Sequence, residues 1–338
     1  MAYQSVTMPP MDSPRFVTPP FDRRAWPMDG RLDYWNAPSS PDESGWPLRR
    51  YRLGSGARGR MLVLGGRGDM IEKYLEVIHH WAERGWAVTS FDWRGQGGSG
   101  RLTDDPFCGH IEDFGQWIAD LNAFTADWRA EGEGPTAIVA HSMGGHLLLR
   151  ALIEGMGAER MIAPDAAVTV APMMGVHSAP LPRWLAVAIA ETMCALGFDR
   201  KQAWTQKEES ERQRHMRQKR LTHDPERYAD ELWWRDHSRD VALGPPSWRW
   251  VEQALHSTHL LATQPGLERI AVPLLMLAAQ NDRLVSTPAI RRTAARVPGA
   301  RLHVYGREAA HEILRELDPV RLDALARIDG FLDEVAPR

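Results

Sequence analysis

Short apolar runs alternate with helical patterns along most of this chain. The apolar runs are rich in Val, Ile, Leu and Ala, and the segments between them carry apolar residues at helical spacing. Parallel strands that are buried on both faces have this continuous apolar character, and crossover helices connect them. The pattern therefore predicts an α/β fold, with a mostly parallel central sheet flanked by helices. The expected strands are 31–36, 46–53, 61–64, 87–91, 136–140, 166–170, 273–279 and 301–304, and the expected helices include 71–84, 109–130 and 144–155.

Two segments interrupt the alternation. Residues 1–30 are rich in Pro and Met and have no periodicity, so we expect an N-terminal arm there. Residues 176–262 contain no convincing strand and are charged, Trp-rich and helical in pattern. An insertion between two strands covers the strand ends, where open α/β sheets bind their ligands. The predicted organisation is the arm at 1–30, a core made of 31–175 and 263–338, and a helical cap (a lid) at 176–262.

The composition is ordinary for a globular protein and narrows the possible classes. Of the 338 residues 43% are hydrophobic and 25% charged, and the formal net charge of −3 gives no reason to expect a nucleic-acid partner. The two cysteines imply no disulfide framework. The first ten residues do not resemble a secretory signal, and the apolar stretch 181–196 is too short to span a membrane. We expect a cytoplasmic protein, and the sequence leaves its oligomeric state open.

The run A-I-V-A-H-S-M-G-G-H places Ser142 directly after a buried strand and directly before a helix. A sharp strand-to-helix turn of this kind lifts a serine hydroxyl out of the sheet, where it can act as a nucleophile. Small residues must flank the turn: Ala140 stands where Gly is commoner, and Gly144 fills the second small position. Because glycine is abundant, an ordinary junction with an incidental serine can produce the same loose match.

Asp282 and His311 follow later strands of the same expected sheet. A serine hydroxyl needs a base to take its proton, and the base needs an acid to orient it. Asp282 lies just past the strand at 273–279, and His311 lies on the loop after the last strand, at the start of a helical pattern. Each residue alone is better explained as a turn or helix-terminus residue. Their order after Ser142 and their position at strand ends together predict a catalytic triad.

The glycine-rich run L-G-G-R-G-D follows the expected strand at 61–64. Acyl transfer needs two backbone N–H groups that face the negative oxygen of the transition state. Met143, directly after the serine, is expected to supply one of them and Arg67 the other. Gly65, Gly66 and Gly68 let the backbone of this loop approach a substrate closely.

Other patterns resemble cofactor or metal motifs but lack the required context. Two matches to G-x-G-x-x-G, at 54–59 and 95–100, do not connect a strand to a helix; the first is expected to be a hairpin turn and the second a loop. His311 and Glu312 could begin a zinc-binding helix, but Arg315 stands where the second histidine would be. The sequence therefore predicts no metal site and no cofactor.

Taken together, the motifs resemble the lysophospholipase and monoacylglycerol lipase branch of the α/β hydrolases. The resemblance covers roughly residues 45–338 and rests on G-G-R-G-D-M-I-E-K-Y, F-D-W-R-G-Q-G-G-S-G-R, A-H-S-M-G-G-H, Q-N-D-R-L-V and A-A-H-E-I-L. In the cap, L-T-H-D-P-E-R-Y and G-P-P-S-W-R-W are similar to bacterial lysophospholipase-type members. The resemblance implies the α/β-hydrolase fold, with Ser142 as nucleophile, Asp282 as acid and His311 as base. The loop departs from it, because G-G-R-G stands where monoacylglycerol lipases have H-G-x-G.

The cap indicates an apolar substrate. A first group of apolar residues is expected to line an acyl pocket or to pack the cap on the core: Met173, Met174, Leu181, Trp184, Leu185, Val187, Ile189 and Met193. The basic run Arg212–Arg220 could attract a phosphate head group or an anionic membrane, although a solvated helix face is commoner. Trp233, Trp234, Trp248 and Trp250 could pack the cap or form an interfacial or choline-recognising surface.

The favoured hypothesis is a serine hydrolase that cleaves the carboxylic ester of a single-chain lipid, with lysophospholipid as the first choice and peripheral membrane contact through the cap left open. Monoacylglycerol lipase and short-chain carboxylesterase are the alternatives among ester hydrolases. A peptidase would need an acidic cap residue, such as Glu208 or Asp230, to hold a free amine. A non-catalytic binding protein is the alternative of another class, but such proteins usually lack a triad residue, and none is missing here.

Overall fold

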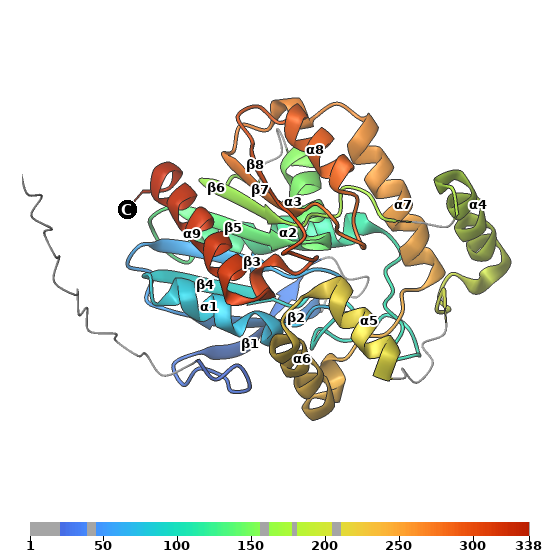
Figure 1. The fold of residues 1–338 in the computed structure, drawn as a ribbon, viewed down its shortest axis with the longest axis horizontal. Coiled ribbons are helices and arrows are strands. Elements are labelled where there is room, and N and C mark those ends of the chain that lie inside the picture. Colours follow the sequence, from blue (N-terminus) through green and yellow to red (C-terminus); the bar gives the residue numbers. More distant parts are fainter. Residues whose placement is uncertain (1–20, 39–44, 156–161, 178–180, 205–210, 338) are drawn as a thin grey trace, which may run out of the picture.

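The computed structural model describes residues 21–38, 45–155, 162–177, 181–204 and 211–337. Residues 1–20 of the expected arm, and Glu208, lie outside these ranges. Within them, eight strands form one sheet in the order β1-β2-β4-β3-β5-β6-β7-β8 (Figure 1). The strands are β1 (Arg31–Ala37), β2 (Trp46–Leu53), β3 (Gly59–Leu64), β4 (Trp86–Phe91), β5 (Thr136–His141), β6 (Ala166–Val170), β7 (Leu274–Ala279) and β8 (Arg301–Tyr305).

The sheet is parallel from β4 to β8, and β1 and β2 extend it as antiparallel strands at one edge. Every residue of β3, β5, β6 and β7 is buried. Helices cover both faces of these central strands, so neither face can be polar, and this explains the continuous apolar runs in the sequence.

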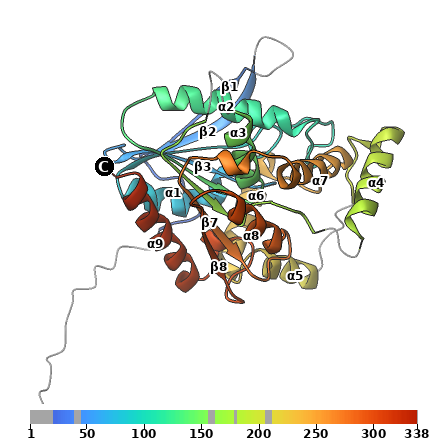
Figure 2. The same cartoon turned by 90° about the horizontal axis from the view of Figure 1, so that it is seen from above.

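Helices lie on both sides of the sheet. The helices α1 (Leu75–Ala82) and α9 (Asp318–Val335) cover one face, and α2 (Phe114–Ala130) and α3 (Met143–Glu154) cover the other (Figures 1 and 2). The helix α8 (Thr287–Arg296) packs beside β7 and β8. The predicted fold class, a mostly parallel sheet flanked by helices, is confirmed.

A helical insertion connects β6 to β7. It contains α4 (Arg183–Met193), α5 (Glu211–Leu221), α6 (Pro225–His237) and α7 (Trp248–Thr263), which lie together at one end of the sheet (Figure 1). The N-termini of α6 and α7 are capped by the residues that precede them. The side chains of Asp224 and Ser247 accept hydrogen bonds from backbone N–H groups in the first turn of each helix. None of the helices in the described ranges is long and apolar enough to cross a membrane.

The described part of the expected arm, residues 21–30, is attached to the insertion. The Trp26 ring packs between a tyrosine of β2 and Trp234 of α6. The indole N–H of Trp234 donates to the carbonyl oxygen of Arg23 over 2.8 Å. Asp230 of α6 binds the side chains of Arg23 and Arg24 over 2.5 and 2.7 Å. Asp230 therefore joins two segments of the chain that are far apart in sequence.

Two local expectations were wrong. The segment 54–59 is not a hairpin turn, because β2 and β3 are not neighbours: β4 lies between them and pairs with both. The expected helix at 109–130 begins later, at Phe114, where the side chain of Asp113 accepts the backbone N–H of Gly115 over 2.7 Å and caps the first turn. Both errors concern boundaries or pairings that the apolar pattern does not specify.

Candidate active site

Ser142 occupies a sharp turn between β5 and α3. Its backbone has φ 50° and ψ −115°, a conformation that residues other than glycine rarely adopt. The neighbouring glycines are required by space. A Cβ atom on Gly144 would lie 2.5 Å from the carbonyl oxygen of Gly65, and one on Gly145 would lie 2.9 Å from the Cβ atom of Pro172. The turn therefore requires glycine at both of these positions.

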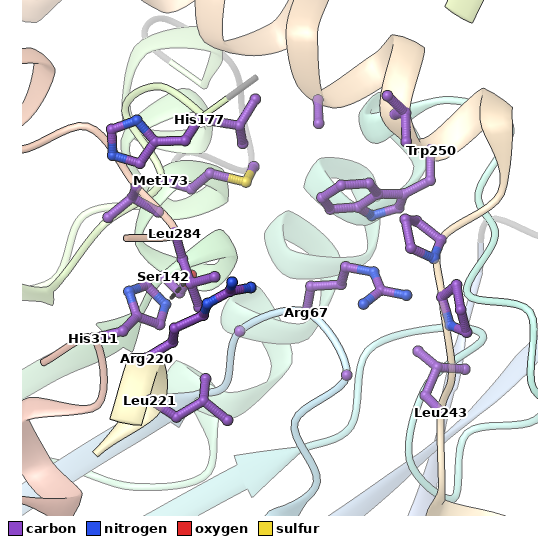
Figure 3. Close-up of a pocket in the computed structure, with 18 of the residues that line it drawn as sticks. Arg67, Ser142, Met173, His177, Arg220, Leu221, Leu243, Trp250, Leu284 and His311 are labelled. Carbon is purple, nitrogen blue, oxygen red and sulfur yellow. Dashed lines mark hydrogen bonds between the residues drawn. The ribbon is translucent and has the colours of Figure 1, made fainter. Parts of the chain in front are cut away.

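The imidazole of His311 connects Ser142 to Asp282. The Nε2 atom of His311 lies 2.9 Å from the Oγ atom of Ser142 (Figure 3), and its Nδ1 atom lies 2.7 Å from Oδ2 of Asp282. All three residues are buried. The other carboxylate oxygen of Asp282 accepts the backbone N–H groups of Leu284 and Val285 over 2.8 and 3.0 Å, which fixes the orientation of the carboxylate. The structure thus brings together the three residues predicted as a triad.

The positive charge of protonated His311 and the negative charge of Asp282 stabilise each other. Burial opposes the imidazolium, but the nearby carboxylate of Asp282 outweighs burial and raises the pKa of His311 above its ordinary value. Burial likewise opposes the carboxylate, yet His311 and the two backbone N–H donors lower the pKa of Asp282. The imidazole can accept the Ser142 proton on Nε2 while Asp282 stabilises the positive charge that forms.

The glycine-rich loop passes close beside the serine. A Cβ atom on Gly66 would lie 2.9 Å from the Cβ atom of Ser142, so only glycine permits this approach. The neighbouring Gly68 has φ +70°, in the left-handed region that favours glycine. In the described part of the chain, the backbone N–H groups of Arg67 and Met143 donate to no protein acceptor, whereas those of both glycines do. These two N–H groups are free to bind a substrate oxygen.

Asp69 stabilises this loop, although no motif in the sequence singled it out. Its Oδ2 atom accepts the backbone N–H of Gly66 over 2.6 Å and the hydroxyl of Tyr74 over 2.5 Å. Its Oδ1 atom accepts from Nζ of Lys73 over 2.5 Å, and Nδ1 of His141 lies 3.1 Å from Oδ2. Although burial opposes ionisation, Lys73 and His141 hold the pKa of Asp69 well below its usual range. Its only signal in the sequence was its place at the end of the glycine-rich run.

A buried cluster of ion pairs joins the loop to the insertion and to the segment that carries His311. The ammonium group of Lys73 lies 2.5 Å from Glu312, directly after His311, and 3.3 Å from Glu231 of α6. The guanidinium group of Arg315 binds the same two carboxylates over 2.5 and 2.9 Å. The cluster therefore links three segments around the serine, and each of its carboxylates has a basic partner.

A cavity of about 910 Å³ opens beside Ser142 (Figure 3). The wall formed by α4, α7 and the segment after β6 is apolar, and it includes Met173, Ala186, Ile189, Val251, Ala254 and Leu255. The wall formed by the glycine-rich loop, its following turn, α5 and α6 carries basic side chains: Arg67, Lys73, Arg217, Arg220 and Arg235. One wall therefore suits an acyl chain, and the other suits a polar or anionic group.

Only part of the expected apolar lining reaches the cavity. Met173, Leu181 and Ile189 line it. Met174 is buried in the core instead, and Trp184 is 71% exposed to solvent. The tryptophans divide in the same way: two of them, Trp248 and Trp250, line the cavity, and the other two are on α6.

The basic run at 212–220 forms most of α5, and its faces differ. Gln213, Met216, Arg217 and Arg220 recur at helical spacing and line the cavity. Of these four only Arg217 is half-buried; the other three are exposed to solvent, as are Arg212, Arg214 and Lys219. The two alternatives weighed in the sequence therefore coexist: the basic side chains of α5 are largely solvated, and those of Arg217 and Arg220 also border the cavity.

Comparison with known proteins establishes the family. A family model described as "Serine aminopeptidase, S33" matches residues 55–318. The chain belongs to this family of α/β hydrolases. Lysophospholipase L2 of Escherichia coli K12 is 30% identical over 334 residues, covering 91% of this chain and 92% of the relative. A probable lysophospholipase L2 of Haemophilus influenzae is 27% identical over 284 residues, covering 82% and 85%.

Solved structures share the fold. A soluble variant of monoglyceride lipase from Saccharomyces cerevisiae aligns with a TM-score of 0.70 at 18% identity, over 94% of this chain and 98% of the other. Monoacylglycerol lipase from Paleococcus ferrophilus aligns with a TM-score of 0.64 at 18% identity, over 85% and 98%. The predicted resemblance to the lysophospholipase and monoacylglycerol lipase branch is confirmed, and the chain is a serine ester hydrolase.

Proposed function

We propose that the chain hydrolyses the carboxylic ester of a lysophospholipid, with Ser142 as the nucleophile. The hydrogen-bonded chain from Ser142 through His311 to Asp282 is the observation that carries this proposal. Ser142 Oγ attacks the ester carbonyl carbon while Nε2 of His311 takes the hydroxyl proton. The tetrahedral oxyanion is bound by the backbone N–H groups of Arg67 and Met143.

The second half of the reaction uses the same groups. His311 gives its proton to the leaving alcohol oxygen, and the carbonyl re-forms as an acyl ester on Ser142. Water then loses a proton to His311 and attacks this ester. The proton returns to Ser142 Oγ as the fatty acid leaves. No further group is needed for the proton balance.

The substrate class is supported by the cavity and by the relatives. An acyl chain is bound by apolar area, which the α4 and α7 wall of the cavity supplies. The two relatives reported above at 27–30% identity over most of this chain are named lysophospholipase L2 and probable lysophospholipase L2. A single acyl chain with a polar head group matches a cavity that has one apolar wall and one basic wall.

A peptidase function, which the family's description suggests, has less support. Holding the free amine of a peptide would need an acidic side chain with no other partner. The acids that line the described part of the cavity are Asp69, Glu231 and Glu312, and each is ion-paired. Asp230, considered from the sequence, binds Arg23 and Arg24 instead.

Peripheral membrane contact through the insertion is part of the proposal. Several large apolar side chains of this region are exposed: Trp184 (71%), Leu196 (65%), Trp204 (57%) and Phe198 (45%). Exposed aromatic and aliphatic side chains are typical of surfaces that lie in the membrane interface. Such a surface would bring the cavity close to lipids that partition into a bilayer.

Activity measurements on matched substrates test the proposal. The set comprises p-nitrophenyl acyl esters of increasing length, lysophosphatidylcholine and monoacylglycerol, with Ser142→Ala as the control variant. We expect the wild type to hydrolyse lysophosphatidylcholine, with a higher kcat/KM than for monoacylglycerol, and the variant to lose at least about a thousandfold. A fluorophosphonate probe should label wild type but not Ser142→Ala. Equal inactivity of both proteins on every ester, with no labelling, would refute the proposal. A preference for monoacylglycerol would refute lysophospholipid as the substrate and make monoacylglycerol the substrate instead.

A further inference from the structure

The side chain of Arg67 has an unusual environment for a partly buried cation. From the loop beside Ser142 it extends across the cavity towards Trp250 (Figure 3). One terminal nitrogen donates to the carbonyl oxygen of Gly244 over 2.5 Å, and the guanidinium carbon lies 5.3 Å from the centre of the Trp250 ring. Its Nε atom is buried and has no hydrogen-bond partner among the residues that the structure describes. No carboxylate in the described ranges lies within ion-pairing distance of Arg67.

The surrounding charge is positive. Among the described residues, five Arg or Lys side chains and three carboxylates line the cavity. The three acids are matched within the ion-pair cluster, by Lys73 and Arg315, and Arg235 lies 2.9 Å from Glu231. Burial, and then the charge of Arg235, lower the pKa of Arg67 to about 10. Arg67 is still protonated at neutral pH, so the cavity keeps a positive charge that no described carboxylate neutralises.

A second basic side chain reaches the same cavity. Arg220 extends from α5 into the space beside Ser142 and His311 (Figure 3). Like Arg67, it forms no ion pair with the residues that the structure describes. Arg220 is exposed to solvent, whereas Arg67 is partly buried. A partly buried charge without a partner is costly, and a bound anion removes that cost for Arg67. Guanidinium groups also match phosphate oxygens in geometry better than an ammonium group does.

We propose that the basic wall binds the phosphodiester of the substrate, with Arg67 as the main contact and Arg220 as the second. The inference rests on the proposed function and adds the group that is recognised. The backbone of Arg67 lies where the ester oxygen is expected, and its side chain leads away from that point. In a lysophospholipid a short glycerol unit separates the ester from the phosphate, whereas monoacylglycerol has only a hydroxyl there. One residue would thus contact both ends of that unit.

Substrate selectivity tests this subsite. The measured quantity is the ratio of kcat/KM for lysophosphatidylcholine to kcat/KM for monoacylglycerol with the same acyl chain. Both lipids are kept monomeric in solution. We expect Arg67→Met to lower this ratio by at least about tenfold, mainly through KM for the phospholipid. Arg67→Lys should keep part of the ratio, because it retains the charge but not the planar fork. Arg220→Met should lower it less.

The matched control is Arg214→Met, which removes an exposed arginine of the same helix outside the cavity. It should leave the ratio unchanged. Thermal melting shows which variants are folded, and Arg220→Met decides the question if Arg67→Met does not fold. An unchanged ratio in a folded Arg67→Met protein, or in Arg220→Met if that variant must decide, would overturn the inference. An equal fall of the ratio in Arg214→Met would also overturn it.

Binding without turnover separates this inference from the proposed function. Calorimetry with glycerophosphate on wild type, Ser142→Ala and Arg67→Met requires no activity. We expect binding to the first two proteins and at least about tenfold weaker binding to Arg67→Met. Binding of inorganic phosphate alone, with no glycerophosphate binding and no change in the lipid ratio, would assign the wall to a free anion and overturn the inference. Inactivity of wild type on all esters would instead refute the proposed function.

Discussion

Replacing Asp69 by Asn tests whether the buried ion-pair cluster positions the oxyanion loop. The substitution keeps the size of the side chain and removes its charge. Asp69 accepts hydrogen bonds from the backbone N–H of Gly66, the hydroxyl of Tyr74 and the ammonium group of Lys73, all within 2.6 Å. An asparagine has one acceptor oxygen in place of two and adds two donors, so it cannot satisfy all of these groups.

The structure sets the size of the two expected effects. Removing one partner of a buried ion pair costs about 3–5 kcal/mol. Lys73 keeps Glu312 at 2.5 Å and Glu231 at 3.3 Å, so we expect a loss of unfolding free energy near the lower value, about 3 kcal/mol. Losing an oxyanion donor lowers kcat by about 10²–10³. The loop would be loosened and not removed, so we expect kcat to fall by about 10²-fold with little change in KM.

Urea unfolding and steady-state kinetics on a p-nitrophenyl ester measure both quantities. Asp120→Asn is the matched control, because Asp120 is fully buried, is paired with Arg94 over 2.7 Å, and does not line the cavity. It should lose similar stability while kcat stays within about threefold of wild type. If Asp69→Asn loses stability but keeps the wild-type kcat, or if both variants lose kcat equally, Asp69 does not position the loop.

Two further predictions concern the base and the turn. The pKa of His311 is raised above 6.5 and only the neutral imidazole accepts the serine proton, so kcat/KM should increase as pH rises through an apparent pKa above 6.5. Asp282→Asn removes the charge that raises this pKa, so the increase should move to lower pH and the plateau should fall by about 10⁴-fold; a profile that does not move would contradict this electrostatic role. Gly144→Ala places a methyl group 2.5 Å from the Gly65 carbonyl and should cost about 1–3 kcal/mol in urea unfolding and lower kcat. Gly330→Ala in α9 meets open space and should be neutral or stabilising, and equal losses in the two glycine variants would exclude the steric explanation.

Local patterns accounted for most of the fold. A strand buried on both faces must be apolar throughout. Each of β3, β5, β6 and β7 can therefore be identified in the sequence from its own apolar run. The turn at Ser142 is equally local, because its geometry depends on the strand before it and the small residues after it. Asp282 and His311 became candidates through chain order, and only the folded chain places them 2.7 Å apart.

The pairing between strands could not be predicted from these apolar runs. Because β2 and β3 are consecutive and joined by glycines, the sequence favoured a hairpin, yet β4 separates them in the sheet. An apolar pattern records that a strand is buried and does not record its neighbour. The choice of neighbour depends on how the helices between the strands cross the sheet.

The sequence by itself therefore determined the fold class, the turn at Ser142 and the three residues of the candidate triad. The tertiary structure decided the role of Asp69, whose partners come from β5 and from the segment before α1. It also decided which arginines of α5 face the cavity and where the Arg67 side chain leads. The physical reason is the same throughout: burial selects apolar residues in local patterns along the chain, whereas charge pairing depends on distances between segments that only folding brings together.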